Sequence, residues 1–241
     1  MTEATSAPRL RVVNLGLPTT GTTTLAHALR LSGLKIADYR IRRRQTSDPG
    51  LQGAFVGQCL YEGYFNSGDP LVRMDGFDGF SEISCLREGQ SLWPQMDWGL
   101  ITAIRAHHPG TRFLASWREA RALSDSMVRW SNLGTERLPG SDVPGLPRGF
   151  GATTAERVRW IEGHYAHLRA LFHDDPALLI YDVADPEAPA RIGAHIGRPV
   201  TWWGRANRNP KAGRATEGQA AWPVSICISG WNMWGLRACN R

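Results

Sequence analysis

A glycine-containing loop, GLPTTGT at residues 16–22, is the stretch of this sequence best suited to chemistry. A short, β-branched apolar run at 10–15 precedes it and predicts a buried parallel strand. The segment after the loop has helical spacing and ends at Gly33. A strand, a glycine loop and a helix together direct backbone N–H groups and a helix N-terminus at one anion. The pattern therefore predicts a phosphate-binding loop, to which the threonines at 22–24 add hydroxyl donors.

The loop lacks the lysine of a nucleoside-triphosphate-binding loop. In the pattern G-x-x-x-x-G-K-[ST] that lysine contacts the β- and γ-phosphates. Gly16 and Gly21 have the required spacing, but Thr22 occupies the lysine position. An ATPase or kinase would lose its main cationic contact here, so a nucleotide or nucleoside kinase is kept only as an alternative. A βα turn that binds no ligand is the other interpretation of the loop taken alone.

The same residues resemble the 5′-phosphosulfate loop of sulfotransferases that use 3′-phosphoadenosine 5′-phosphosulfate (PAPS). Those loops typically read P-K-[ST]-G-T-[TS]. The residues that match are Pro18, Thr20, Gly21, Thr22 and Thr23, and the resemblance implies that they bind PAPS. Thr19 stands where the loop lysine is expected, beside the reacting bond. Loss of one preorganised cation costs ~10²–10³ in rate.

Three explanations for Thr19 stay open. An arginine from the run Arg40–Arg44 substitutes for the lysine, the chain uses another sulfuryl donor, or its activity is impaired. A non-catalytic nucleotide-binding relative is therefore a further alternative to the enzyme.

A second match follows the apolar run at 111–116, which predicts another buried strand. Arg118 comes directly after that run, and Ser126 lies eight residues later on a helix predicted at 119–130. In PAPS sulfotransferases an arginine and a serine in this arrangement bind the 3′-phosphate. The chemistry is reasonable, because a guanidinium and a hydroxyl can converge on one dianion.

The resemblance extends over most of the chain, from about residue 10 to residue 216. Lys211 and Arg214, in the segment NPKAGRAT, are the implied members of a basic loop over the 3′-phosphate. Residues 1–216 are thus predicted to be one sulfotransferase domain. Residues 217–241 match no known pattern and form a C-terminal tail of unclear role.

Carboxylates at predicted strand ends are the candidates for the base that removes the acceptor proton. Glu82 ends a predicted strand at 75–83, at the edge where open α/β sheets bind ligands. Asp38 follows a short predicted strand at 34–37 and is the second candidate, and Asp78 is the third. A structural ion pair is the alternative role for each of these acids.

The Pro- and Gly-rich stretch at 132–151 predicts a mobile lid, an acceptor-binding insertion or a disordered segment. An amphipathic helix is expected at 154–172, with His164 and His167 flanking its apolar face without a chemical role. The acceptor is expected to be the hydroxyl or amine of a small molecule or glycan. This loop and the 10 tryptophans favour a flat, apolar acceptor.

Composition narrows the class of protein. The 241 residues carry a net charge of +6 without a lysine-rich tail, which disfavours nucleic acid as a partner. The four cysteines have no C-x-x-C spacing, so no metal site is expected. Neither a signal peptide nor a membrane span is recognisable, which predicts a cytoplasmic protein. The resemblance implies a bacterial enzyme. The expected fold is a single α/β domain, a central parallel sheet flanked by helices, in the P-loop-NTPase-like sulfotransferase class.

Overall fold

The protein is built around one five-stranded sheet in which neighbouring strands are parallel. The computed structural model describes residues 9–87 and 89–206. The strands are β1 (Val12–Asn14), β2 (Ile36–Ala37), β3 (Gly79–Phe80), β6 (Arg112–Trp117) and β7 (Leu178–Asp182). Their order across the sheet is β2-β3-β1-β6-β7. The predicted α/β architecture with a central parallel sheet is therefore confirmed.

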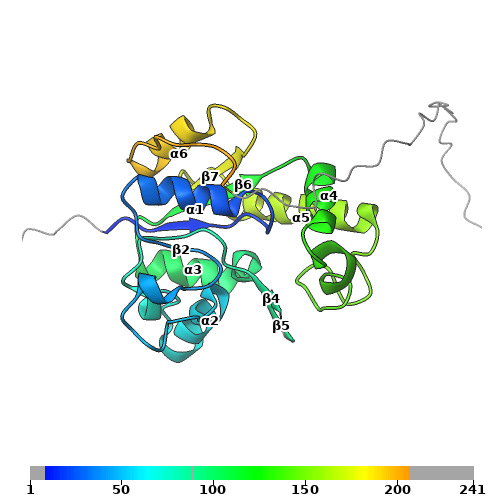
Figure 1. Ribbon diagram of the computed structural model, residues 1–241, viewed down its shortest axis with the longest axis horizontal. Coiled ribbons are helices and arrows are strands. Elements are labelled where there is room, and N and C mark those ends of the chain that lie inside the picture. The colour runs from blue at the N-terminus through cyan, green and yellow to red at the C-terminus, as the bar shows by residue number, and fades with distance from the viewer. Residues whose placement is uncertain (1–8, 88, 207–241) are drawn as a thin grey trace, which may run out of the picture.

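Helices cover both faces of the sheet (Figure 1). They are α1 (Thr22–Leu31), α2 (Val56–Ser67), α3 (Trp98–His107), α4 (Ala120–Arg129), α5 (Thr154–Leu171) and α6 (Ala188–Ile196). Successive strand residues point to opposite faces. Accordingly Val12 packs with α1 and α6, while Val13 belongs to the larger core that includes side chains of α2, α3, α4 and α5.

Local signals account for the ends of several helices. Glu119 caps α4 by accepting hydrogen bonds from the backbone N–H groups of Arg121 and Ala122. Thr153 and Glu156 form a reciprocal capping box at the start of α5. Gly197 ends α6 with a φ of 67°, a left-handed conformation that glycine adopts without steric cost. These ends agree with the helices expected at 119–130 and 154–172 within one or two residues.

Some local structure was not predicted. Strands β4 (Cys85–Arg87) and β5 (Gln90–Leu92) form an antiparallel hairpin outside the main sheet. Short helical turns, three of 3-10 type and the last of π type, lie at Arg43–Gln45, Val72–Met74, Pro94–Met96 and Leu133–Arg137. Within the described residues, no helix combines the length and the apolar character needed to cross a membrane.

The strand order places a topological switch at β1. The chain runs from β1 to β2 and β3 on one side of it, and then to β6 and β7 on the other. In open α/β sheets, ligands bind outside the carboxyl ends of the strands at such a point. The glycine loop at 16–21 leaves the carboxyl end of β1 and leads into α1. The fold therefore puts this loop at the position where a ligand is expected.

Candidate functional site

The base of the glycine loop is fixed by buried side chains from neighbouring strands. Asn14 donates through its amide nitrogen to the Ser81 carbonyl at 2.7 Å. Its amide oxygen accepts from the backbone N–H groups of Gly16 at 3.3 Å and Ser116 at 3.1 Å. A Cβ at residue 16 would overlap the Ser116 hydroxyl, so only glycine lets the loop approach β6 this closely. One asparagine thus joins β1, β3 and β6 beneath the loop.

Thr20 points into the protein. Its side chain is fully buried, and its hydroxyl donates to the Leu17 carbonyl at 2.6 Å and lies 2.6 Å from the Ser116 hydroxyl. The resemblance implied that Thr20 binds the donor. In the structure its hydroxyl shapes the loop, and a ligand would meet the loop's backbone at this residue.

Helix α5 supports the same loop from below. The Tyr165 hydroxyl donates to the Ser116 carbonyl at 2.6 Å. Burial lowers the pKa of His164 to about 4, so its ring is neutral at pH 7. His164 Nε2 lies 2.8 Å from the Leu15 carbonyl oxygen and, being neutral, carries the proton on that nitrogen. His164 is therefore a buried structural residue beside the loop, whereas the sequence predicted only that it flanks the apolar face.

The N-terminus of α1 is open toward the loop. Its N-cap, Gly21, has a φ of 91° and no side-chain capping hydrogen bond, and the first turn holds no acid. The N–H groups of the first helical turn have no partner within a helix, and they bear partial positive charge. Thr23 is half-buried in this turn, and the Thr24 hydroxyl donates to the Gly204 carbonyl at 2.9 Å. This arrangement suits an anion.

Thr19 has a strained backbone. Its φ is 68°, a region that β-branched residues rarely adopt. Its Oγ1 is buried and forms no hydrogen bond within the described residues. A residue in such a conformation costs about 1–3 kcal/mol, and residues of this kind concentrate at functional sites. The position at which the resemblance implies a lysine is therefore strained, and its hydroxyl has no hydrogen-bond partner among the described residues.

Glu82 lies just beyond β3, beside the first residue of α1. It is 8% exposed, and its carboxylate accepts from the Ser84 hydroxyl at 2.6 Å. Burial raises its pKa to about 7, partly offset by hydrogen bonds from Ser84 and Thr22. A carboxylate with this pKa is partly ionised at neutral pH and can accept a proton there.

Asp38 approaches Glu82 from the end of β2. Burial raises the pKa of Asp38, which accepts a 3.0 Å hydrogen bond from the Ser81 hydroxyl. Its negative charge in turn contributes to the raised pKa of Glu82. The backbone N–H of Tyr39 donates to the Glu82 carbonyl at 2.9 Å and so joins the two strand ends. Tyr39 itself has a φ of 57°. The two acids that the sequence ranked first thus meet at the glycine loop.

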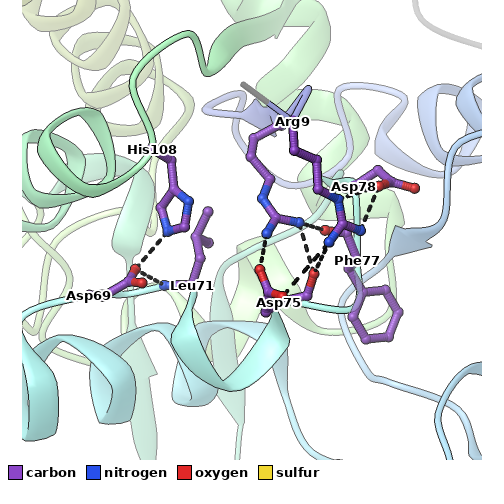
Figure 2. Close-up of polar contacts among 8 residues, drawn as sticks. Arg9, Asp69, Leu71, Asp75, Phe77, Asp78 and His108 are labelled. Carbon is purple, nitrogen blue, oxygen red and sulfur yellow. Dashed lines mark hydrogen bonds and ion pairs between the residues drawn. The ribbon is translucent and has the colours of Figure 1, made fainter. Parts of the chain in front are cut away.

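Asp78 lies at the opposite edge of the sheet. It precedes β3, and one of its oxygens accepts from Arg9 at 2.7 Å (Figure 2). The other oxygen accepts from the Lys35 backbone N–H at 2.8 Å. Its pKa is lowered, because these hydrogen bonds and the nearby arginines outweigh the opposing effect of burial. Asp78 therefore has the structural ion-pair role, away from the glycine loop.

Arg118 directly follows β6, and Glu82 lies just beyond β3. One strand, β1, separates these two strands in the sheet. Burial lowers the pKa of Arg118, and the charge of Arg205 lowers it further. Its Nε is buried and has no hydrogen-bond partner within the described residues. Ser126 is half-buried on α4, and the hydrogen bonds described here do not join the two side chains. The nearby carboxylate of Asp182 raises the pKa of Arg118 and so offsets part of the positive charge. The two arginines and the unused buried donor of Arg118 still suit an anion.

Arg205 was missed by the sequence analysis. It follows Gly204, whose carbonyl accepts from the Thr24 hydroxyl in the first turn of α1. This segment therefore lies beside the start of the helix that follows the glycine loop, and the charge of Arg205 acts on Arg118. The basic segment GRANRNP could have indicated Arg205, since the resemblance already placed a basic loop in this region. Lys211 and Arg214, which were predicted instead, lie outside the described residues.

The arginines at 40–44 form their described side-chain hydrogen bonds away from the glycine loop. Arg40 Nε donates to the Gly53 carbonyl at 2.5 Å, and Arg43 Nε donates to Gln52 at 3.2 Å. Arg42 and Arg44 line a separate basic hollow of about 380 Å³, together with Arg30, Lys35, Ile36 and Gln45. The charge of Arg42 still acts on Asp38 and lowers its pKa, but no described hydrogen bond joins the run to the glycine loop.

Among the described residues, no three or more histidine, cysteine, aspartate or glutamate side chains are grouped so that they could hold a metal ion. The chain matches neither a model of a known protein family nor any curated protein.

Proposed function

We propose that this protein transfers a sulfuryl group from PAPS to an acceptor hydroxyl, and that its fold is of the P-loop-like sulfotransferase type. One observation carries the proposal. The open N-terminus of α1 lies at the switch point of the sheet, beside a buried carboxylate whose pKa is about 7. An anion-binding helix end next to a neutral-pH base is the pair of groups that such a transfer requires.

Each group then has a defined part in the reaction. The first-turn N–H groups of α1, together with Pro18, Gly21, Thr22 and Thr23, bind and orient the phosphosulfate. Arg118 and Arg205, whose positive charges are close enough to interact, bind the 3′-phosphate of the donor. A new bond forms between the acceptor oxygen and sulfur, and the bond between sulfur and the bridging oxygen breaks. Glu82 accepts the proton that leaves the acceptor, and adenosine 3′,5′-diphosphate is released.

Asp38 has a supporting part in this scheme. Burial is the main reason that the pKa of Glu82 is near neutrality, and the negative charge of Asp38 raises it further. Asp38 is thus a positioning and tuning residue, and Glu82 is the catalytic base.

Nucleotide binding without transfer is the second candidate function, and one observation favours it. Thr19 replaces the loop lysine, and the arginines at 40–44 make their described contacts elsewhere. No preorganised cation among the described contacts then meets the charge on the leaving oxygen. A protein of this kind would bind the donor nucleotide and release it unchanged.

Calorimetric titration of the full chain with adenosine 3′,5′-diphosphate, 5′-AMP and ATP tests the donor site. We expect the 3′,5′-diphosphate to bind more tightly than 5′-AMP. Arg118→Ala should remove this preference, because a charge-assisted hydrogen bond contributes about 1.5–3 kcal/mol. Arg121→Ala is the matched control, since Arg121 is an exposed arginine three residues further along the chain.

The outcomes separate the candidates. Tighter binding of ATP than of the 3′,5′-diphosphate would favour a kinase and contradict the proposal. If the 3′,5′-diphosphate binds, incubation with PAPS and a phenolic acceptor decides between the remaining two. Release of the diphosphate together with a sulfated product supports transfer, and binding without turnover supports the second candidate.

A further inference from the structure

A large hollow lies between the Pro- and Gly-rich loop and α5. Its volume is about 820 Å³, which is within the range of small-molecule sites. Apolar side chains form much of its wall: Met96, Pro144, Leu146, Pro147, Phe150 and Trp160. Phe150 is 53% exposed, which is unusual for a large aromatic side chain. The hollow therefore offers an apolar surface that a flat ligand could cover.

The loop that forms this hollow is well packed. Trp160 Nε1 donates to the Pro144 carbonyl at 2.9 Å. The buried guanidinium of Arg157 donates to the carbonyls of Gly151 and Ala152, each at 2.8 Å. Leu146 is buried within the core. Of the three roles that the sequence left open for 132–151, these contacts favour a preformed wall over a mobile lid or a disordered segment.

Helix α5 gives the hollow an open floor. Arg159, Gly163 and His167 all line it, and their spacing of four residues places them on one face of the helix. A Cβ at residue 163 would have no neighbour within 4 Å. Glycine weakens a helix interior by roughly 0.5–1 kcal/mol relative to alanine. Because Gly163 has no side chain, open space remains between Arg159 and His167 on this face of the helix.

Arg159 leaves a positive charge uncompensated at the edge of the hollow. Its guanidinium is exposed and has no hydrogen bond or ion pair within the described residues. Glu156, the acid in the same lining, accepts from the backbone N–H groups of Gly151 and Thr153 at 3.0 Å each. Both bonds go to Oε2, and the partial positive charge at the N-terminus of α5 offsets part of the negative charge of this carboxylate. The charge at this edge therefore favours an anionic group on the ligand.

One residue of the lining, His164, also supports the strand that leads into the glycine loop. Its ring donates to the Leu15 carbonyl at the root of that loop. A single imidazole thus separates the apolar wall from the backbone that leads into the proposed donor site.

We infer that this hollow binds the acceptor, a flat aromatic compound that carries an anionic group as well as the reacting hydroxyl. Its rings lie against Trp160 and Phe150, and its anion faces Arg159. The acceptor role rests on the proposed function, whereas binding of such a compound does not depend on it.

The experiment titrates the full chain with 6-hydroxy-2-naphthoate, and with 2-naphthol as the probe that lacks the carboxylate. Gly163→Leu should weaken both probes at least tenfold, because the new side chain enters open space and fills the hollow. Gly163→Ala, its matched control, should bind both nearly as the native chain does. Arg159→Ala should weaken the naphthoate about fivefold or more and leave 2-naphthol within twofold. Arg169→Ala, an exposed arginine of α5 outside the lining, is the control for charge.

Several results would overturn the inference. One is naphthoate binding that is unchanged in Gly163→Leu. Another is an equal loss of naphthoate affinity in Arg159→Ala and Arg169→Ala. The third is displacement of the naphthoate by adenosine 3′,5′-diphosphate. Circular dichroism checks that each variant is folded. Failure of the proposed function would look different, because the probe would still bind in a Gly163-dependent manner but would not be sulfated in the presence of PAPS.

Discussion

The hydroxyl groups of Thr20 and Ser116 lie 2.6 Å apart, inside the protein and directly beneath the glycine loop. This pair joins the loop after β1 to β6, the neighbouring strand. The threonine that resembles a donor-binding residue therefore holds the shape of the loop with its side chain, and the loop's backbone remains available to a ligand.

Thr20→Val should destabilise the protein. Valine has nearly the same shape but removes a buried hydroxyl, and breaking a buried hydrogen bond of this kind costs about 1–3 kcal/mol. The free energy of unfolding in urea measures the loss. Thr23→Val is the control, because Thr23 is half-buried and makes no described side-chain hydrogen bond. Equal stability of the two variants would contradict this view of Thr20.

Glu82 should make stability depend on pH. Its pKa is raised from the ordinary 4.5 to about 7 in the folded protein, so the folded state binds this proton more tightly than the unfolded state. The stabilisation of the folded state by this bound proton is fully present below about pH 4.5 and is lost as the pH rises to about 7. Glu82→Gln cannot ionise and so should not show this loss. Above pH 7 its free energy of unfolding should be roughly 3 kcal/mol higher than that of the native chain.

Urea unfolding of the native chain and Glu82→Gln at pH 5 and pH 8 measures this difference. A stability gap between the two proteins that does not grow with pH would show that Glu82 is not held protonated by burial. The same carboxylate should give sulfuryl transfer an ascending pH profile with a midpoint near 7, since only the ionised form accepts a proton. Glu82→Gln should abolish that activity.

Thr19→Lys should raise turnover more than it raises affinity for the donor. An ammonium at this position would meet the negative charge that develops on the leaving oxygen, an interaction made mainly in the transition state. Single-turnover sulfuryl transfer by the native chain and the variant tests it. Thr19→Gly separates the effect of charge from that of backbone strain, because glycine relieves the φ of 68° without adding a cation.

Two further variants test whether an arginine already supplies the positive charge at the leaving oxygen. Arg205→Ala removes the arginine that lies close to Arg118, and Arg40→Ala removes one whose guanidinium contacts Gly53. We expect only the former to weaken binding of the 3′,5′-diphosphate. A collapse of turnover in Arg40→Ala would instead mean that the arginine run supplies the missing charge. If none of these variants differs from the native chain, the loop is not the reaction centre.

Arg157→Leu should loosen the wall of the apolar hollow. The Arg157 side chain is almost fully buried, and it joins α5 to the loop through the carbonyls of Gly151 and Ala152. Its removal leaves the buried Gly151 carbonyl without this donor, at a cost of about 1–3 kcal/mol, whereas Ala152 is exposed and its carbonyl can bond to water. Protease cleavage within 138–151 should become faster, while Arg159→Ala should leave the cleavage rate unchanged. Unchanged cleavage in Arg157→Leu would mean that other contacts hold the loop.

The sequence by itself determined the local features of this protein. The β-branched run, the two glycines and the helical spacing after them predicted a strand, a loop and a helix, because each pattern reflects interactions between residues close in the chain. The strand end before Arg118 and the helix carrying Ser126 were predicted for the same reason. These elements alternate along the chain, which was enough to indicate a parallel sheet flanked by helices.

Only the tertiary structure decided which side chains meet. The inward direction of Thr20 depends on Ser116, which is 96 residues away in the chain. The raised pKa of Glu82 requires burial by elements on both sides of β3, and the approach of Asp38 requires β2 to lie beside that strand. The packing of 132–151 depends on α5, whose contacts with the loop no local pattern reveals. Spacing along a chain records local geometry, whereas burial and pairing arise only when distant segments pack together.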